Sequence, residues 1–128
     1  AVGVALLAML SLLLGGCGRA QQAAGYQTND TYQVSFATKP TPPVIGDGQV
    51  TVTVLDAQGK PVDGARVALE ANMNHAGMTP EYADIMSGTN GVYTGPLKWT
   101  MGGEWYVDAK ITLPGGEVLR RRFPVDVK

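Results

Sequence analysis

The sequence has little of the chemistry on which most enzymes depend. Its 128 residues include one cysteine and one histidine. A single cysteine excludes an intramolecular disulfide. The lone histidine has no acidic partner at a recognisable catalytic spacing, and the serine at Ser87 lacks a Gly-x-Ser-x-Gly setting. Without an assembled acid, base and nucleophile, we expect that the protein is not an enzyme.

Charge is also scarce, and it is balanced. Charged residues make up 16% of the chain and the net charge is -1. This composition gives no electrostatic attraction to nucleic acid, and we expect none as a partner. Glu81 and Asp84 with one histidine make a poor zinc ligand set, and two acids three residues apart are more typical of a solvated loop.

A helical pattern is missing as well. No window places apolar residues at the helical period, while 17 glycines and 8 prolines mark many turns. Apolar and polar residues instead alternate in about seven segments. We therefore predict an all-β fold over residues 31–128, an immunoglobulin-like antiparallel β-sandwich of about seven strands. The predicted strands cover residues 32–37, 50–55, 65–69, 82–86, 92–99, 105–113 and 118–127.

Two turns and one irregular strand qualify this prediction. Residues 45–48 are predicted as a turn, and Asn90-Gly91 is a strong hairpin signal. In the last strand Arg121 falls on the apolar face, so either a bulge shifts the register or Arg121 lies beyond the core edge. The run 120–122 is either a basic patch or a charged edge strand, and we favour the edge strand. The predicted core comprises Val52, Val54, Val67, Leu69, Trp105, Val107, Ile111 and Phe123.

The amino-terminal residues predict export and anchoring rather than fold. Residues 1–16 form an apolar run of the signal-peptide type, too short to span a bilayer comfortably. Leu14-Gly15-Gly16-Cys17 resembles a bacterial lipobox, which makes Cys17 the lipidation site. The alternative is an ordinary signal peptide with a chance cysteine. Residues 17–30 are small and polar, typical of a flexible tether. We expect a bacterial cell-envelope protein, lipid-anchored to the membrane, with its domain on the extracytoplasmic side.

The candidate site is the stretch Asn72 to Met78, which predicts a loop. It holds His75 between Met73 and Met78, and imidazole with thioethers suits copper(I). Met86 and Met101 lie near other turns and are further candidate ligands. In the alternative reading the methionines fill the core, and Met73 and His75 continue the register of Val67 and Leu69 to cap the sandwich end.

A family resemblance supports the copper interpretation. Residues 72–78 and the later Met101-Gly102-Gly103-Glu104-Trp105-Tyr106-Val107 resemble the YtkA-like and FixH-like domains of bacterial envelope proteins, over about residues 31–127. The resemblance implies an immunoglobulin-like sandwich and copper handling. It matches His75 and Met78 best, then Met73, with Met101 at an apolar position before the tryptophan. This chain has few methionines and no second histidine.

The resemblance leaves two functions open. In the first, an exported lipoprotein binds copper(I) through its Met/His loop for metal handling or delivery. In the second, the domain is a non-metal protein-interaction module that docks on a membrane efflux or oxidase-assembly partner. Its methionines would then form a soft apolar contact surface.

Overall fold

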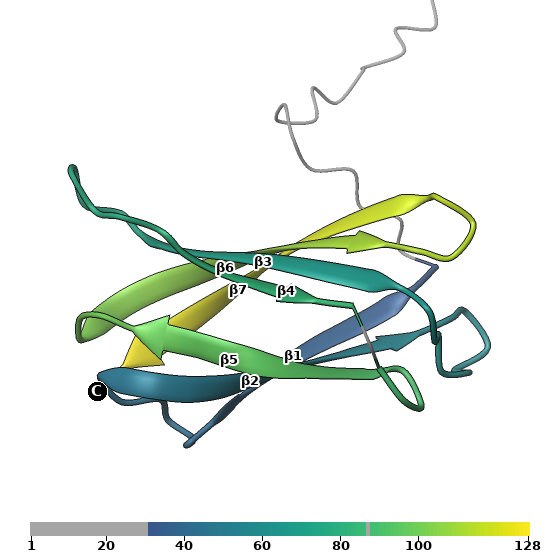
Figure 1. Cartoon of the computed structure of the whole chain (residues 1–128), viewed down its shortest axis with the longest axis horizontal. Helices are drawn as coiled ribbons and strands as arrows, with labels where there is room; N and C mark the ends of the chain where they lie inside the picture. The colour runs from purple at the N-terminus through teal and green to yellow at the C-terminus, as the bar shows by residue number, and fades with distance from the viewer. Residues whose placement is uncertain (1–30, 87) are drawn as a thin grey trace, which may run out of the picture.

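The computed structural model describes residues 31–86 and 88–128. They form two antiparallel sheets packed face to face (Figure 1). The first sheet has the order β1-β2-β5 and the second the order β4-β3-β6-β7. The predicted immunoglobulin-like β-sandwich is confirmed. The strands are β1 (Gln33–Lys39), β2 (Gly46–Leu55), β3 (Arg66–Met73), β4 (Glu81–Ile85), β5 (Val92–Trp99), β6 (Gly103–Thr112) and β7 (Val118–Val127).

Alternation within the strands builds the core. In β2 every second residue, Val50, Val52 and Val54, is fully buried, while the threonines between them are not. Trp105, Val107 and Ile111 of β6 face them from the other sheet. Each such side chain contributes roughly 1.5–3 kcal/mol on burial. Phe123 was predicted to lie in the core, but it is only half-buried and packs at the margin of the core.

The margin at Phe123 is where β1 faces β7. The ring of Phe123 stacks on Phe36 with centroids 5.2 Å apart. The β6–β7 register runs unbroken from Gly103↔Val127 to Thr112↔Val118, so no bulge exists in it. Arg121 therefore does share the inner face, at the core edge, and its Nη2 donates a hydrogen bond to the carbonyl oxygen of Tyr32 at 3.2 Å.

Two turn predictions need correction. Residues 46–48 belong to β2, because they pair with residues 97–99 of β5. Asn90 and Gly91 have φ of 56° and 72°, and Thr89 and Val92 exchange both backbone hydrogen bonds across them. The tight turn is real, yet it joins no hairpin, since β4 and β5 belong to different sheets. The chain uses this turn to cross between the layers.

The predicted signal peptide (1–16), Cys17 and the tether (17–30) lie outside the described residues. In the described part, no helix has the length and hydropathy to span a bilayer. All seven strands lie between residues 33 and 127 and bury their apolar faces against one another. A chain of residues 18–128 therefore holds the complete sandwich and is expected to fold on its own.

Candidate metal-binding end of the sandwich

The Met/His loop lies at one end of the sandwich. It occupies residues 74–80, between the end of β3 and the start of β4. The Met78 amide donates a hydrogen bond to the His75 carbonyl at 3.4 Å, and Gly77 between them has φ of 78°. His75 is exposed, whereas Met78 is half-buried and packs against the core. The loop thus presents the imidazole to solvent and turns one thioether inward.

Met73 belongs to the core beneath the loop. It is the last residue of β3, only 5% exposed, and is paired with Trp105 of β6. Its Cε lies 3.1 Å from the position that a Cβ on Gly103 would take. The core-filling interpretation therefore describes Met73 correctly. It does not extend to His75, because the strand ends at Met73 and the imidazole is exposed.

Met101 is at the same end of the molecule. It lies in the β5–β6 turn, which Figure 1 shows at the same end as the β3–β4 loop. Its side chain is 45% exposed, and its carbonyl accepts a hydrogen bond from Trp105 Nε1 at 2.9 Å. Since Trp105 also pairs with Met73, one tryptophan connects the turn to the strand that carries the loop.

Met86 is at the opposite end. It follows β4, whose last residue Ile85 pairs with Val67 near the start of β3. The five residues of β4 separate it from the loop, a span of about 17 Å at the usual rise per strand residue. Met86 is 69% exposed there. The structure therefore does not bring Met86 together with His75, although it brings Met73, Met78 and Met101 to one end.

The acids near the loop do not form a site for a harder metal. Within residues 31–86 and 88–128, no group of three or more His, Cys, Asp or Glu side chains is placed to hold a metal ion. Asp84 pairs with Arg66, with Nη2 to Oδ2 at 2.6 Å. The hydrogen bond between them lowers the pKa of Asp84 and raises that of Arg66. Within the described residues, the acids alone therefore form no metal-binding group at this end.

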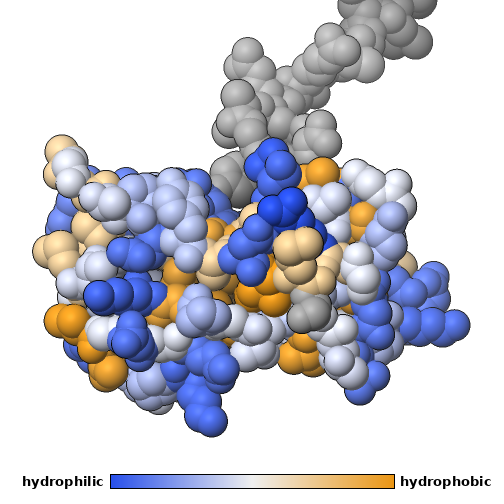
Figure 2. Space-filling view, viewed as in Figure 1, coloured by the Kyte–Doolittle hydropathy of each residue, from blue (hydrophilic) through white to orange (hydrophobic). Residues whose placement is uncertain are grey.

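Two features of this end were missed from the sequence. Val44 and Ile45 are 46% and 58% exposed, and Ile45 Cδ1 lies beside Gly102 in the turn that carries Met101. Figure 2 shows hydrophobic surface at this end of the molecule. Val44, Ile45 and Met101 together form an apolar rim. The prediction of a turn at residues 45–48 did not indicate this surface. A hydrophobic dipeptide directly after three prolines was the available signal.

Two tryptophans form the second missed feature. Trp99 and Trp105 pack edge to face, with ring centroids 5.4 Å apart. Trp99 is fully buried, and its Nε1 has no hydrogen-bond partner among the described residues. The indole lies over Gly48, where an added Cβ would come within 3.0 Å of Nε1. The pair lies in the core at this end and gives it an intrinsic fluorescence reporter.

The fold and this end together define a small immunoglobulin-like β-sandwich with a Met/His loop. A YtkA-like family model matches residues 26–110. The chain therefore belongs to the YtkA-like family, as the resemblance in the sequence indicated. The FixH-like part of that resemblance stays a prediction. Among the curated proteins, none matches this chain.

Several solved structures are similar to this chain at low identity. An engineered protein, Northeast Structural Genomics Consortium target OR128, has 21% identity and a TM-score of 0.49 over 75% of this chain, which spans only 20% of that one. The PmoD soluble domain from Methylocystis sp. ATCC 49242 (Rockwell) has 8% identity and a TM-score of 0.46, covering 76% of this chain and 90% of its own. Superoxide reductase (neelaredoxin) from Ignicoccus hospitalis has 16% identity and a TM-score of 0.44, covering 77% and 80%.

Proposed function

We propose that this YtkA-like protein binds copper(I) at the loop end of the sandwich. One observation carries the proposal: two separate segments, residues 73–78 and the β5–β6 turn, bring the only imidazole and three thioethers to the same end. His75 and Met78 are the principal ligands, Met101 comes from the neighbouring turn, and Met73 lies beneath the loop. Met86 is outside the proposed set because β4 separates it from the loop.

The arrangement fits binding followed by transfer rather than permanent burial. Soft thioethers and a borderline imidazole match copper(I) and discriminate against hard cations. His75 is exposed, so a bound ion would be accessible to an incoming acceptor ligand. We therefore assign metal handling or delivery, and no catalysis, to this end. With Cys17 lipidated, the domain would act at the extracytoplasmic membrane surface of a bacterial envelope.

Methionine methyl NMR tests the ligand set directly. Residues 18–128 contain four methionines, Met73, Met78, Met86 and Met101, hence four methyl signals. Adding one equivalent of copper(I) without oxygen should move the signals of Met78, Met101 and Met73. Met86 serves as an internal control and should stay in place. If no signal moves, or if all four move alike, the proposed site is wrong.

The alternative function rests on a different observation at the same end. The apolar rim of Val44, Ile45 and Met101 is exposed and lies beside the loop. Such a surface suits docking on an efflux or oxidase-assembly partner without any metal. Under that function His75→Ala leaves partner capture unchanged, while Ile45→Ser weakens it. Copper(I) would then leave all four methionine methyl signals unchanged.

A further inference from the structure

The three consecutive arginines of β7 have three different environments. Arg122 forms a two-pronged ion pair with Asp108, at 2.7 and 2.9 Å. Arg121 points to the inner face and binds the carbonyl oxygen of Tyr32. Arg120 lies on the outer face of the four-stranded sheet, and its guanidinium has no partner in the described part of the chain. A charged edge strand therefore explains the run only in part.

The residue opposite Arg120 is a second unpaired cation. Lys110 of β6 pairs directly with Arg120 in the strand register, and its ammonium has no ion-pair partner among the described residues. Like charges directly opposite each other in a sheet are destabilising. The other strand neighbour of Lys110 is Ala68, and beyond it Asp84 is already paired with Arg66. The acid in this row of the sheet is therefore paired with another cation.

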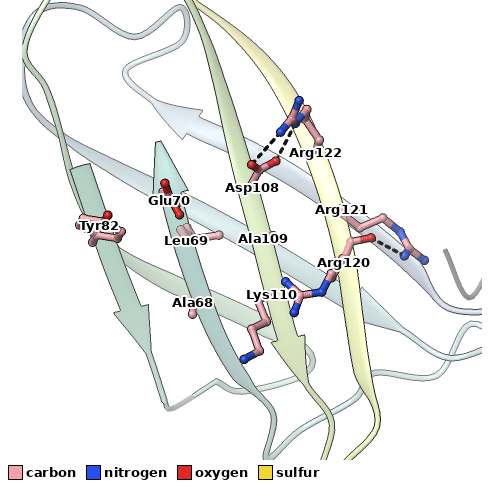
Figure 3. Close-up of a pocket in the computed structure, with 10 residues that line it drawn as sticks. All are labelled: Ala68, Leu69, Glu70, Tyr82, Asp108, Ala109, Lys110, Arg120, Arg121 and Arg122. Atoms are coloured by element: carbon pink, nitrogen blue, oxygen red, sulfur yellow. Dashed lines mark hydrogen bonds and ion pairs between the residues drawn. The ribbon is translucent and has the colours of Figure 1, made fainter. Parts of the chain in front are cut away.

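The small side chain of Ala68 leaves a hollow beside the two cations. The hollow has a volume of about 420 Å³, with Tyr82 on its β4 side. Figure 3 shows the Arg120 guanidinium reaching from β7 toward β6 on the side of Lys110. Two acids also line the hollow. Asp108 is paired with Arg122, and Glu70 accepts a hydrogen bond from Asn72 Nδ2 at 3.0 Å. The charged lining residues whose side chains lie on this outer face are Glu70, Asp108, Lys110, Arg120 and Arg122, three positive and two negative, because Arg121 points to the inner face.

We propose that this hollow binds a phosphate group between Lys110 and Arg120. A guanidinium offers a planar pair of donors that matches phosphate oxygens, and an ammonium adds a point charge. A bound dianion would turn the repulsion of the cross-strand pair into a favourable arrangement. The phosphate belongs either to a free anion or to an anionic lipid headgroup. This site lies on the outer sheet face and does not depend on the proposed copper site.

A phosphate titration of residues 18–128 tests the proposal. Amide resonances are followed by NMR while inorganic phosphate replaces chloride at constant ionic strength. Saturable shifts are expected at Ala68, Lys110 and Arg120. The Lys110→Gln variant should bind about tenfold more weakly, because a hydrogen bond to a charged group is worth a free energy of that order. The control Lys60→Gln removes one exposed turn cation and should bind as the unmodified chain does.

A charge reversal separates binding from folding. Lys110→Glu places an acid opposite Arg120, so it should raise stability while abolishing the phosphate shifts. Unsaturable shifts, or shifts equal in Lys110→Glu and Lys60→Gln, would overturn the proposal and leave only a solvated charged face. Flotation with vesicles then identifies the source. Binding to phosphatidylglycerol-containing vesicles but not to pure phosphatidylcholine, lost in Lys110→Glu, indicates a lipid headgroup. Phosphate shifts without vesicle binding indicate a free anion.

Discussion

Removing one buried hydroxyl, by Tyr93→Phe, should cost a large share of the stability. Tyr93 lies in β5, is fully buried, and reaches the β2–β3 connection. Its hydroxyl donates a hydrogen bond to the Val62 carbonyl at 2.6 Å and accepts one from the Ala65 amide at 3.0 Å. The substitution preserves the ring and its packing, so it isolates these two hydrogen bonds.

The magnitude follows from the groups that lose their partner. The Ala65 amide is buried, so it incurs the full penalty of an unsatisfied donor, and the Val62 carbonyl is half-buried. A penalty of about 1–3 kcal/mol for each unsatisfied group gives a total of about 2–4 kcal/mol, with the carbonyl near the lower limit. A core tyrosine hydroxyl thus ties the β2–β3 connection to β5 of the three-stranded sheet.

Urea unfolding of residues 18–128 measures this loss. The matched control is Tyr82→Phe, because Tyr82 is 67% exposed and its hydroxyl makes no hydrogen bond to the described residues. The control should stay within about 0.5 kcal/mol of the unmodified chain. If Tyr93→Phe also stays within that range, the argument from buried hydrogen bonds is refuted.

Substitutions at three further positions test other features. Gly91→Ala should lower the free energy of unfolding by about 1–3 kcal/mol because of the positive φ alone. The loss should be larger still, because the new Cβ would lie 2.5 Å from the Val54 carbonyl oxygen. Urea unfolding measures the loss, with Gly115→Ala as the control, because a Cβ there meets nothing within 4 Å. In the same assay, the free energy of unfolding of Met73→Leu should stay within about 1.5 kcal/mol of the unmodified chain. Met73→Ala should lower it by about 2–5 kcal/mol. Asp84→Asn should lower stability slightly at pH 7. Because the hydrogen bond from Arg66 lowers the pKa of Asp84, that difference persists above the ordinary carboxylate pKa and is lost as the pH falls below it. A difference independent of pH would contradict the ion-pair argument.

Alternation predicted the strands because each one has a single buried face. The apolar positions of β6, from Trp105 to Ile111, point inward as their period of two requires. The Asn90-Gly91 signal predicted the local turn correctly but not its partners. A tight turn depends on two residues, whereas the sheet that each flanking strand joins depends on contacts far along the chain.

The candidate site was predictable in its chemistry and only partly in its geometry. Composition predicted a loop over residues 72–78, but β3 continues through Met73 and the loop occupies residues 74–80. The position of Met101 at the same end follows from the β5–β6 turn. The opposite position of Met86 could not be predicted, because it depends on β4 pairing antiparallel to β3. The burial of Met73 was left open, since a methionine at a strand end suits both a core and a soft-metal site.

A copper(I) competition titration is the most direct test of the central claim. Residues 18–128 compete anaerobically with a chromophoric chelator, beside His75→Ala, a Met73→Leu/Met78→Leu double variant, and Met86→Leu as the matched control. We expect one copper(I) per chain, lost in the first two variants and retained in Met86→Leu, with zinc(II) failing to compete. No withdrawal of copper from a chelator of micromolar strength, or equal affinity in all four proteins, would contradict the account and leave the docking function in its place.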